Sequence, residues 1–209
     1  NTDWHSKEPQ IRARGAKSCT CQDADGGKIS FTLSSKTDPV STPFGATSFN
    51  DEITTRKTIE YNLSPAQEAQ FEKFDNWAIG YISLHSERLL KKKLTEDQVR
   101  EGYRSPVTRK ANYGAHMRCK INTSGKGMVR CWDVDNQRRE LPTDLRHHEV
   151  VPRINISHLW MMSREYGWVF QTNDILVTDN QEECPFGELP DLFKQCERRC
   201  ELVRLITGE

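Results

Sequence analysis

Alternation of apolar and polar residues, which is typical of half-buried β-strands, marks several short segments of this chain. It predicts strands over residues 28–33 (KISFTL), 53–63, 116–121 (HMRCKI) and 128–134 (MVRCWDV). A turn-forming, glycine-rich run, NTSGKG, separates the last two segments, so we expect them to pair as a hairpin. The middle of the chain is therefore predicted to be antiparallel β-structure.

The most informative stretch begins at Arg153 and reads RINISHLWMMSREYGWVFQTNDILV. Its two aromatic-rich runs belong to strands predicted over 150–162 and 166–178, which the polar hinge Ser-Arg-Glu joins. Side chains of a strand alternate between two faces, so at most about half of these aromatics can be exposed. We expect Trp160 to lie nearer a binding groove and Trp168 nearer the core.

Helical periodicity replaces the alternation between residues 64 and 102. The sequence SPAQ at Ser64 is a capping box with proline at the first helical position, and apolar residues follow at three- and four-residue steps through about Leu90. The same signature at Thr95 opens a shorter helix that stops near Gly102. We interpret the apolar stripe of these helices as core.

The elements divide the chain into three parts. Residues 1–52 read as an extended N-terminal arm with a short strand, residues 53–178 as one domain with a helical insertion at 64–102, and residues 179–209 as a linker and closing helix. The predicted fold class is mainly β with helical insertions (α+β), in the form of a small barrel or sandwich. The natural candidate is an OB-like (oligonucleotide/oligosaccharide-binding) antiparallel barrel with an N-terminal helical pair and a C-terminal helix.

Charge is distributed unevenly along this 209-residue chain, although its net charge is zero. Residues 88–130 carry 12 Lys/Arg against 3 Asp/Glu, a net charge of +9, between acidic flanks. Clustered cations bind phosphates by releasing their counterions, so this island favours a polyanionic partner. The alternative is a solvated helix face with its counter-charges elsewhere in the fold.

No apolar run approaches the roughly 20 residues that cross a bilayer, so we expect no membrane-spanning segment.

Cysteine spacing gives no strong metal signature. The seven cysteines, an odd number, lie at positions 19, 21, 119, 131, 184, 196 and 200. Zinc held by the first two and a pair from the last three is one alternative, but the first pair lacks the usual two-residue gap. Positions 119 and 131 could face each other across the predicted hairpin. We predict buried reduced thiols, with no metal and no cofactor.

Catalytic motifs are poorly represented. The sequence contains no phosphate-binding P-loop, no G-x-S-x-G elbow, no H-E-x-x-H and no dinucleotide fingerprint. His158 beside an apolar run favours a hydrogen-bonded, half-buried histidine over a metal ligand. A nuclease would need clustered carboxylates, and the turn at a hairpin end explains Asp133 and Asp135 more simply. We therefore predict that the protein is not an enzyme.

Single-stranded nucleic acid needs flat apolar faces on which bases stack and cations that meet its phosphates. The β region supplies both. Alternation places Arg118 and Lys120 on one face of their strand, and Arg130 on the same face as Trp132. The candidate nucleic-acid-binding residues are Arg118, Lys120, Lys126, Arg130, Trp132, Arg153, Trp160 and Arg164.

Several spaced motifs also carry a family resemblance. In order they are YRSPV from Tyr103, YGAHMRCK from Tyr113, the CWDVD segment, the Leu-Trp pair that ends at Trp160, and EYGW ending at Trp168. Over residues 53–178 the chain resembles the single-stranded-DNA-binding proteins of giant nucleo-cytoplasmic DNA viruses and their algal and protist homologues.

The resemblance implies an OB-type barrel with a helical insertion that coats single-stranded DNA during replication, recombination or repair. It implies that Lys120, Arg130, Arg153, Trp132 and Trp160 lie on or near the binding groove. Such proteins typically end in an acidic tail, whereas this chain closes with CERRCELVRL in a predicted helix.

Two functional hypotheses follow. The first is a sequence-tolerant binder of single-stranded DNA that uses aromatic stacking and phosphate neutralisation, without turnover. The second is a repurposed OB-like accessory or structural subunit, held by the protein subunits of a large assembly and without nucleic-acid binding.

The sequence starts at Asn1, which indicates processing or trimming. We expect an intracellular protein, and the residues leave its compartment open. One alternative is an organelle, which the protein would reach by means of a transit peptide that is then removed. The large assembly of the second hypothesis could then be organellar, for example a photosynthetic complex.

Overall fold

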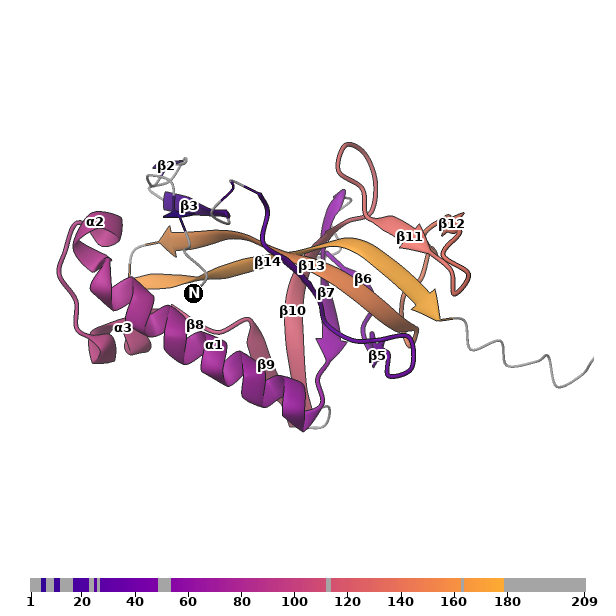
Figure 1. Ribbon diagram of the computed structural model, residues 1–209, viewed down its shortest axis with the longest axis horizontal. Helices are drawn as coiled ribbons and strands as arrows, with labels where there is room; N and C mark the ends of the chain where they lie inside the picture. The colour runs from indigo at the N-terminus through magenta and orange to yellow at the C-terminus, as the bar shows by residue number, and fades with distance from the viewer. Residues whose placement is uncertain are drawn as a thin grey trace, which may run out of the picture. The chain divides into compact units, whose positions relative to one another are not determined.

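The structure is a computed structural model in which helices and strands are described for most of the chain (Figure 1). The residues that it describes are 5–6, 10–11, 17–22, 25, 27–48, 54–111, 114–162 and 164–178. Within them, fourteen strands join one sheet and three helices accompany it. The predicted fold class, mainly β with helical insertions, is confirmed at this level.

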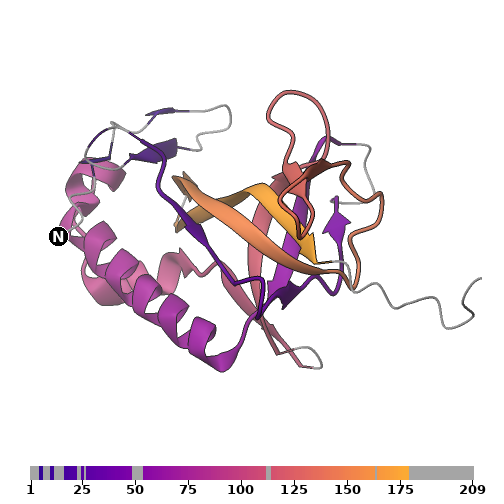
Figure 2. The same cartoon turned by 45° about the vertical axis from the view of Figure 1, so that its right-hand side comes forward.

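A long hairpin forms the spine of the sheet. Strands β13 (Glu149–Met162) and β14 (Glu165–Thr178) pair antiparallel along their whole length and lie side by side in both views (Figure 1; Figure 2). Their turn falls at the predicted Ser-Arg-Glu hinge, where Met162 lies opposite Glu165. The two strands predicted from the aromatic-rich stretch are therefore confirmed.

Five N-terminal strands assemble on the β13 side of this hairpin. Strands β3, β4 and β5 each pair antiparallel with β13, and β1 and β2 pair with β3. The predicted strand at 28–33 is observed as β4, whereas the strand β3 and its pairing with β13 were not predicted. The bounds of the five are β1 His5–Ser6, β2 Gln10–Ile11, β3 Lys17–Gln22, β4 Ser30–Thr32 and β5 Val40–Ser41.

The β14 side is built differently, because β8, β10 and β11 all pair with β14 in the parallel direction. The sheet therefore contains parallel pairs, whereas the sequence predicted an antiparallel arrangement. Beyond β10 the order continues to β7 and β6, and among the described strands no pairing joins β6 back to β1, so the sheet is open. The bounds are β6 Ala46–Thr47, β7 Arg56–Asn62, β8 Tyr103–Arg104, β9 Val107–Lys110, β10 Gly114–Asn122, β11 Arg130–Trp132 and β12 Arg138–Arg139.

The predicted hairpin between 116–121 and 128–134 is wrong. Both segments run in the same direction along β14, with Lys120 opposite Gln171 and Arg130 opposite Asp174. Residues 123–129 therefore form a loop that leaves the edge of β14 after β10 and brings the chain back to β14 at β11.

The turn that follows β11 joins it instead to β12, antiparallel. At this turn the Asp133 carboxylate accepts hydrogen bonds from the backbone N–H groups of Asp135 and Gln137, at 3.0 and 2.7 Å. The two carboxylates belong to a hairpin end, as predicted.

Three helices separate β7 from β8: α1 (Pro65–Leu84), α2 (Ser86–Leu90) and α3 (Glu96–Gly102). Both predicted capping boxes, at Ser64 and Thr95, are present. Helix α1 runs alongside the β13–β14 hairpin (Figure 1) and buries its apolar stripe there. The rings of Phe71 and Phe74 lie 6.2 and 5.6 Å from that of Phe170 on β14, both edge-on. This contact identifies the face of the hairpin that is core.

The thiols of three described cysteines within the sheet are buried, as predicted: Cys19, Cys119 and Cys131. Burial raises the pKa of the Cys119 thiol. The cysteines at positions 184, 196 and 200, which the zinc alternative requires, lie outside the described residues, as does the predicted C-terminal helix. None of the described helices is long and apolar enough to cross a membrane.

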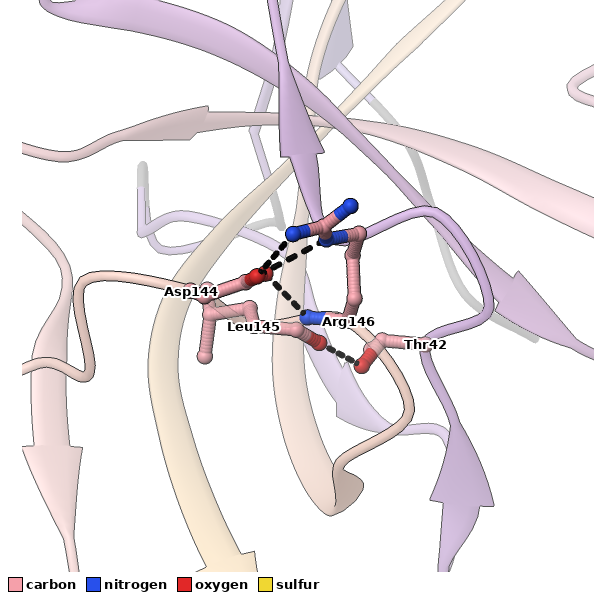
Figure 3. Close-up of polar contacts among 4 residues, drawn as sticks. All are labelled: Thr42, Asp144, Leu145 and Arg146. Carbon is pink, nitrogen blue, oxygen red and sulfur yellow. Dashed lines mark hydrogen bonds and ion pairs between the residues drawn. The ribbon is translucent and has the colours of Figure 1, made fainter.

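A buried hydroxyl ties together the two segments that lead into β13. Thr42, which is 0% exposed, donates to the carbonyl of Leu145, and its backbone N–H donates to the His148 carbonyl at 3.0 Å. Asp144 and Arg146 form an exposed ion pair on either side of Leu145 (Figure 3). The hydrogen bonds with Arg146 hold the pKa of the Asp144 carboxyl down, at about 2. These contacts fix where β13 begins, and β13 carries much of the site described next.

Candidate nucleic-acid interface

The β13–β14 hairpin has one core face and one open face. Ile154 and Leu159 of β13 are buried, as are Trp168 and Phe170 of β14. Trp168 is 6% exposed, which confirms its predicted place in the core, whereas Trp160 projects from the opposite side and is only half-buried. Tyr166 and Phe170 are also buried, so the aromatics of the hairpin do divide between the two faces.

Polar side chains cross the open face in rows, because residues paired between neighbouring strands point to the same side. We call this open face the outer sheet face. One row runs through Thr58, Lys120, Gln171, Asn155 and Ser30, on β7, β10, β14, β13 and β4. The next row runs through Thr32, Arg153, Asp174 and Arg130, on β4, β13, β14 and β11.

A β-bulge in β14 separates these two rows. Arg153 pairs with Asp174 and Asn155 pairs with Gln171, so β14 uses one residue more than β13 between them. A bulge of this kind re-aims side chains that would otherwise alternate. Here Asn173 and Asp174, although consecutive, both line the same hollow on the outer sheet face.

Asp174 joins a cation and an aromatic ring of the predicted site. Its Oδ1 lies 2.6 Å from Arg130 Nε, and Arg130 Nη2 donates to Oδ2 at 2.7 Å. The indole N–H of Trp132 donates to Oδ1 at 3.0 Å. The hydrogen bond and the charge of Asp174 raise the pKa of Arg130. The carboxylate therefore fixes the positions of both side chains.

Lys120 is the most enclosed cation of the outer sheet face. Its Nζ donates to the hydroxyl of Thr58 at 2.9 Å. Partial burial lowers the pKa of Lys120, and the nearby charges of Arg118 and Arg56 lower it further. A group of like charges that repel one another gains free energy when a polyanion binds beside it.

Trp160 lies over Gly167, its partner on β14. A Cβ atom built on Gly167 would lie 3.1 Å from Trp160 Nε1, so the indole uses the space that a side chain would fill. Trp160 and Trp132 stand opposite Gly167 and Leu176 of β14, and at about 3.3 Å per residue this places them roughly 30 Å apart along that strand. The two indoles therefore flank the basic rows.

A hollow of about 370 Å³ opens between the indoles, which we call the Asn155 hollow. Three cations, a carboxylate, two amides and a methionine contribute to its wall. The lining residues are Lys28, Ser30, Gly127, Met128, Arg130, Arg153, Asn155, Asn173 and Asp174.

The remaining predicted site residues fall in two places. Arg118 is exposed on β10, and Lys126 is exposed on the loop that brings Gly127 and Met128 to the hollow. Arg164 lies instead at the β13–β14 turn, where it lines a separate hollow of about 820 Å³ beside α2 and α3. The structure thus brings seven of the predicted residues onto or beside one face and sets Arg164 apart.

Sequence reasoning missed Lys28, Asn155, Asn173 and Asp174. Alternation already places Asn155 on the same face as Arg153, so this residue could have been found. The other three could not, because they depend on pairing with β13 and on the bulge. Within the described residues, no three His, Cys, Asp or Glu side chains are grouped to hold a metal ion.

Comparison with known proteins gives a limited likeness. No family model matches the chain, and no curated protein matches it. Among solved structures, the single-stranded-DNA-binding protein of bacteriophage T7 is 11% identical, with a TM-score of 0.48 over 72% of this chain and 92% of that chain.

The single-stranded-DNA-binding protein of bacteriophage Enc34, truncated at its C-terminus, is 8% identical, with a TM-score of 0.47 over 83% of this chain and 95% of that chain. The same Enc34 protein in complex with single-stranded DNA gives 9% identity and a TM-score of 0.42 over 84% of this chain and 93% of that chain. With TM-scores below 0.5 these likenesses carry no functional weight for this chain, and the resemblance to the giant-virus family stays a prediction.

Proposed function

We propose that the protein binds single-stranded DNA on its outer sheet face, with little sequence preference and without catalysis. One observation carries the proposal: basic side chains stand in rows between two half-buried tryptophans, on the open face of a hairpin whose other face is packed core. Cations that track a backbone and aromatic platforms for bases are the two components that such binding requires.

Each component has an assigned part in the binding. Arg118, Lys120 and Arg153 would meet phosphates, with Lys126 approaching from its loop. Trp160 and Trp132 would offer ring faces to bases at the two ends of the rows. Arg130 is already paired with Asp174, so it would contribute less to phosphate neutralisation than its exposure suggests.

Three more specific points remain predictions. They are the role in replication or repair, the membership of the giant-virus family and the OB-barrel assignment. The second hypothesis, an accessory subunit without nucleic-acid binding, differs from the first in what covers the outer sheet face. A direct binding measurement separates the two.

The test is titration of a fluorescent oligo-dT 20-mer between 50 and 300 mM salt. We expect affinity that falls with salt, because each phosphate contact to a single strand contributes about −0.7 to the slope of log K against log salt. The double variant Arg118→Met/Arg153→Met should flatten that slope by about 1.4. Arg100→Met is the matched control, because Arg100 is an exposed arginine on α3 that contacts Asn76, and it should leave the slope unchanged.

A folded protein that fails to bind oligo-dT at 50 mM salt would exclude the proposal and favour the subunit hypothesis. Trp160→Phe gives an independent reading. Stacking quenches indole fluorescence, so this variant should lose part of the quenching on oligo-dT while it keeps the salt slope.

A further inference from the structure

The side-chain amide of Asn155 opens into the hollow. Asn155 is only 8% exposed and lines the hollow, and its amide forms no hydrogen bond with another described residue. Its amide atoms are not among the fully enclosed polar atoms that lack a partner in the described part of the chain, so they reach solvent in the hollow. The amide is therefore available to pair with a ligand there.

The β14 bulge adds two polar groups to the same wall. It turns Asn173 and Asp174 together into the hollow. The two amides, of Asn155 and Asn173, each present both donors and acceptors, whereas the carboxylate only accepts. Part of its acceptor capacity is used by Arg130 and Trp132.

This combination of groups favours a base over a phosphate. Lys28 and Arg153 would attract a phosphate, but a phosphate only accepts hydrogen bonds, so it gains nothing from the amide oxygens or from the Asp174 carboxylate. A nucleobase edge presents donors and acceptors side by side, which asparagine can match. The phosphates on either side of that nucleotide would then lie toward Lys28 and Arg153, at the rim.

We infer that the Asn155 hollow seats one nucleobase that bears an exocyclic amine, and that it disfavours thymine at this position. Cytosine, adenine and guanine each offer an exocyclic amine to the Asp174 carboxylate, whereas the only ring donor of thymine, N3–H, lies between two carbonyl oxygens that the carboxylate repels. The Asp174 carboxylate discriminates between the bases, Asn155 holds the base edge against it, and Met128 contributes an apolar wall. The inference rests on the proposed function and adds a local base preference to it.

The test compares oligo-dC with oligo-dT of the same length at neutral pH and constant salt. Both are pyrimidines, so stacking area is nearly matched, and a homopolymer supplies the chosen base whatever its register. We expect the wild-type protein to bind oligo-dC at least about fivefold more tightly, the lower end for one good hydrogen-bonded base contact. Oligo-dA should also exceed oligo-dT.

Asn155→Ala should bring the dC-to-dT ratio close to one and keep oligo-dT affinity within about twofold. Gln171→Ala is the matched control, because Gln171 pairs with Asn155 across the sheet but does not line the hollow. It should keep the preference. Circular dichroism and a thermal melt establish that both variants are folded.

Equal binding of oligo-dC and oligo-dT by the wild type would overturn the inference and leave the proposed function intact, as would an unchanged preference in Asn155→Ala. A flatter salt slope in Asn155→Ala would assign a phosphate to the hollow and overturn it as well. Failure of the folded wild type to bind any of the oligonucleotides would refute the proposed function itself.

Discussion

Replacing Gly167 by alanine tests how the sheet holds Trp160. The added Cβ would lie 2.6 Å from the backbone carbonyl oxygen of Arg104 on β8, and 3.1 Å from Trp160 Nε1. A backbone atom at that distance cannot swing aside as a side chain does. Either the parallel pairing of β8 with β14 must open or the indole must lift.

Overpacking of this kind costs about 1–3 kcal/mol. Alanine also restricts the unfolded chain, which returns about 0.4–1 kcal/mol. Gly167 has no left-handed backbone conformation that would add strain, so we expect a net loss of about 1–2 kcal/mol in the free energy of unfolding. Urea unfolding followed by circular dichroism measures it.

Gly80→Ala is the matched control, since the Cβ there would meet only Glu96 Oε1 at 3.6 Å, an ordinary contact. In the middle of α1 this change should stabilise the protein by about 0.5–1 kcal/mol. The two substitutions thus have opposite predicted signs. If Gly167→Ala were as stable as the wild type, the indole would not occupy the space described here.

Three further predictions concern other parts of the protein. Thr42→Val should cost about 1–3 kcal/mol of unfolding free energy because it leaves the Leu145 carbonyl without its donor, whereas Thr42→Ser should cost clearly less; urea unfolding of both compares them. Burial on α1 raises the pKa of the Asp75 carboxyl above 3.8, so the native state binds the carboxyl proton more tightly than the unfolded state does. The free energy of unfolding should therefore fall as the pH rises from the unfolded pKa through the native pKa. Asp75→Asn should remove that pH dependence, as urea unfolding from pH 3.5 to 7 can measure. Cys119, buried with a raised thiol pKa, should resist iodoacetamide until urea unfolds the protein, as peptide mass spectrometry can show; rapid labelling of native protein would contradict its burial.

Local patterns in the sequence predicted the local elements well. The capping boxes at Ser64 and Thr95 depend on residues three positions apart, and the β13–β14 turn joins neighbouring strands. Each of these features is decided by nearby residues, so periodicity and capping chemistry suffice to find them.

Pairing between distant strands could not be predicted in the same way. Alternation identified residues 116–121 and 128–134 as strands, but their common partner is β14, where Lys120 pairs with Gln171 and Arg130 with Asp174, about 50 and 44 residues further along the chain. The same limit applies to the site. Alternation showed which basic residues share a face, whereas the contact of α1 with Phe170 decides which face is core, and the bulge at Asn173 has no signature in the sequence.

The position of β14 within the sheet has a consequence for biosynthesis. β14 is the last described strand in the chain, yet it lies between β13 and β10 in the pairing order and is also the partner of β8 and β11. On a ribosome that adds roughly 5–20 residues per second, those earlier strands wait several seconds for the partner that orders them. Their edges are exposed to other chains during that interval, so the yield of native protein should depend on translation speed and on chaperones that bind extended segments.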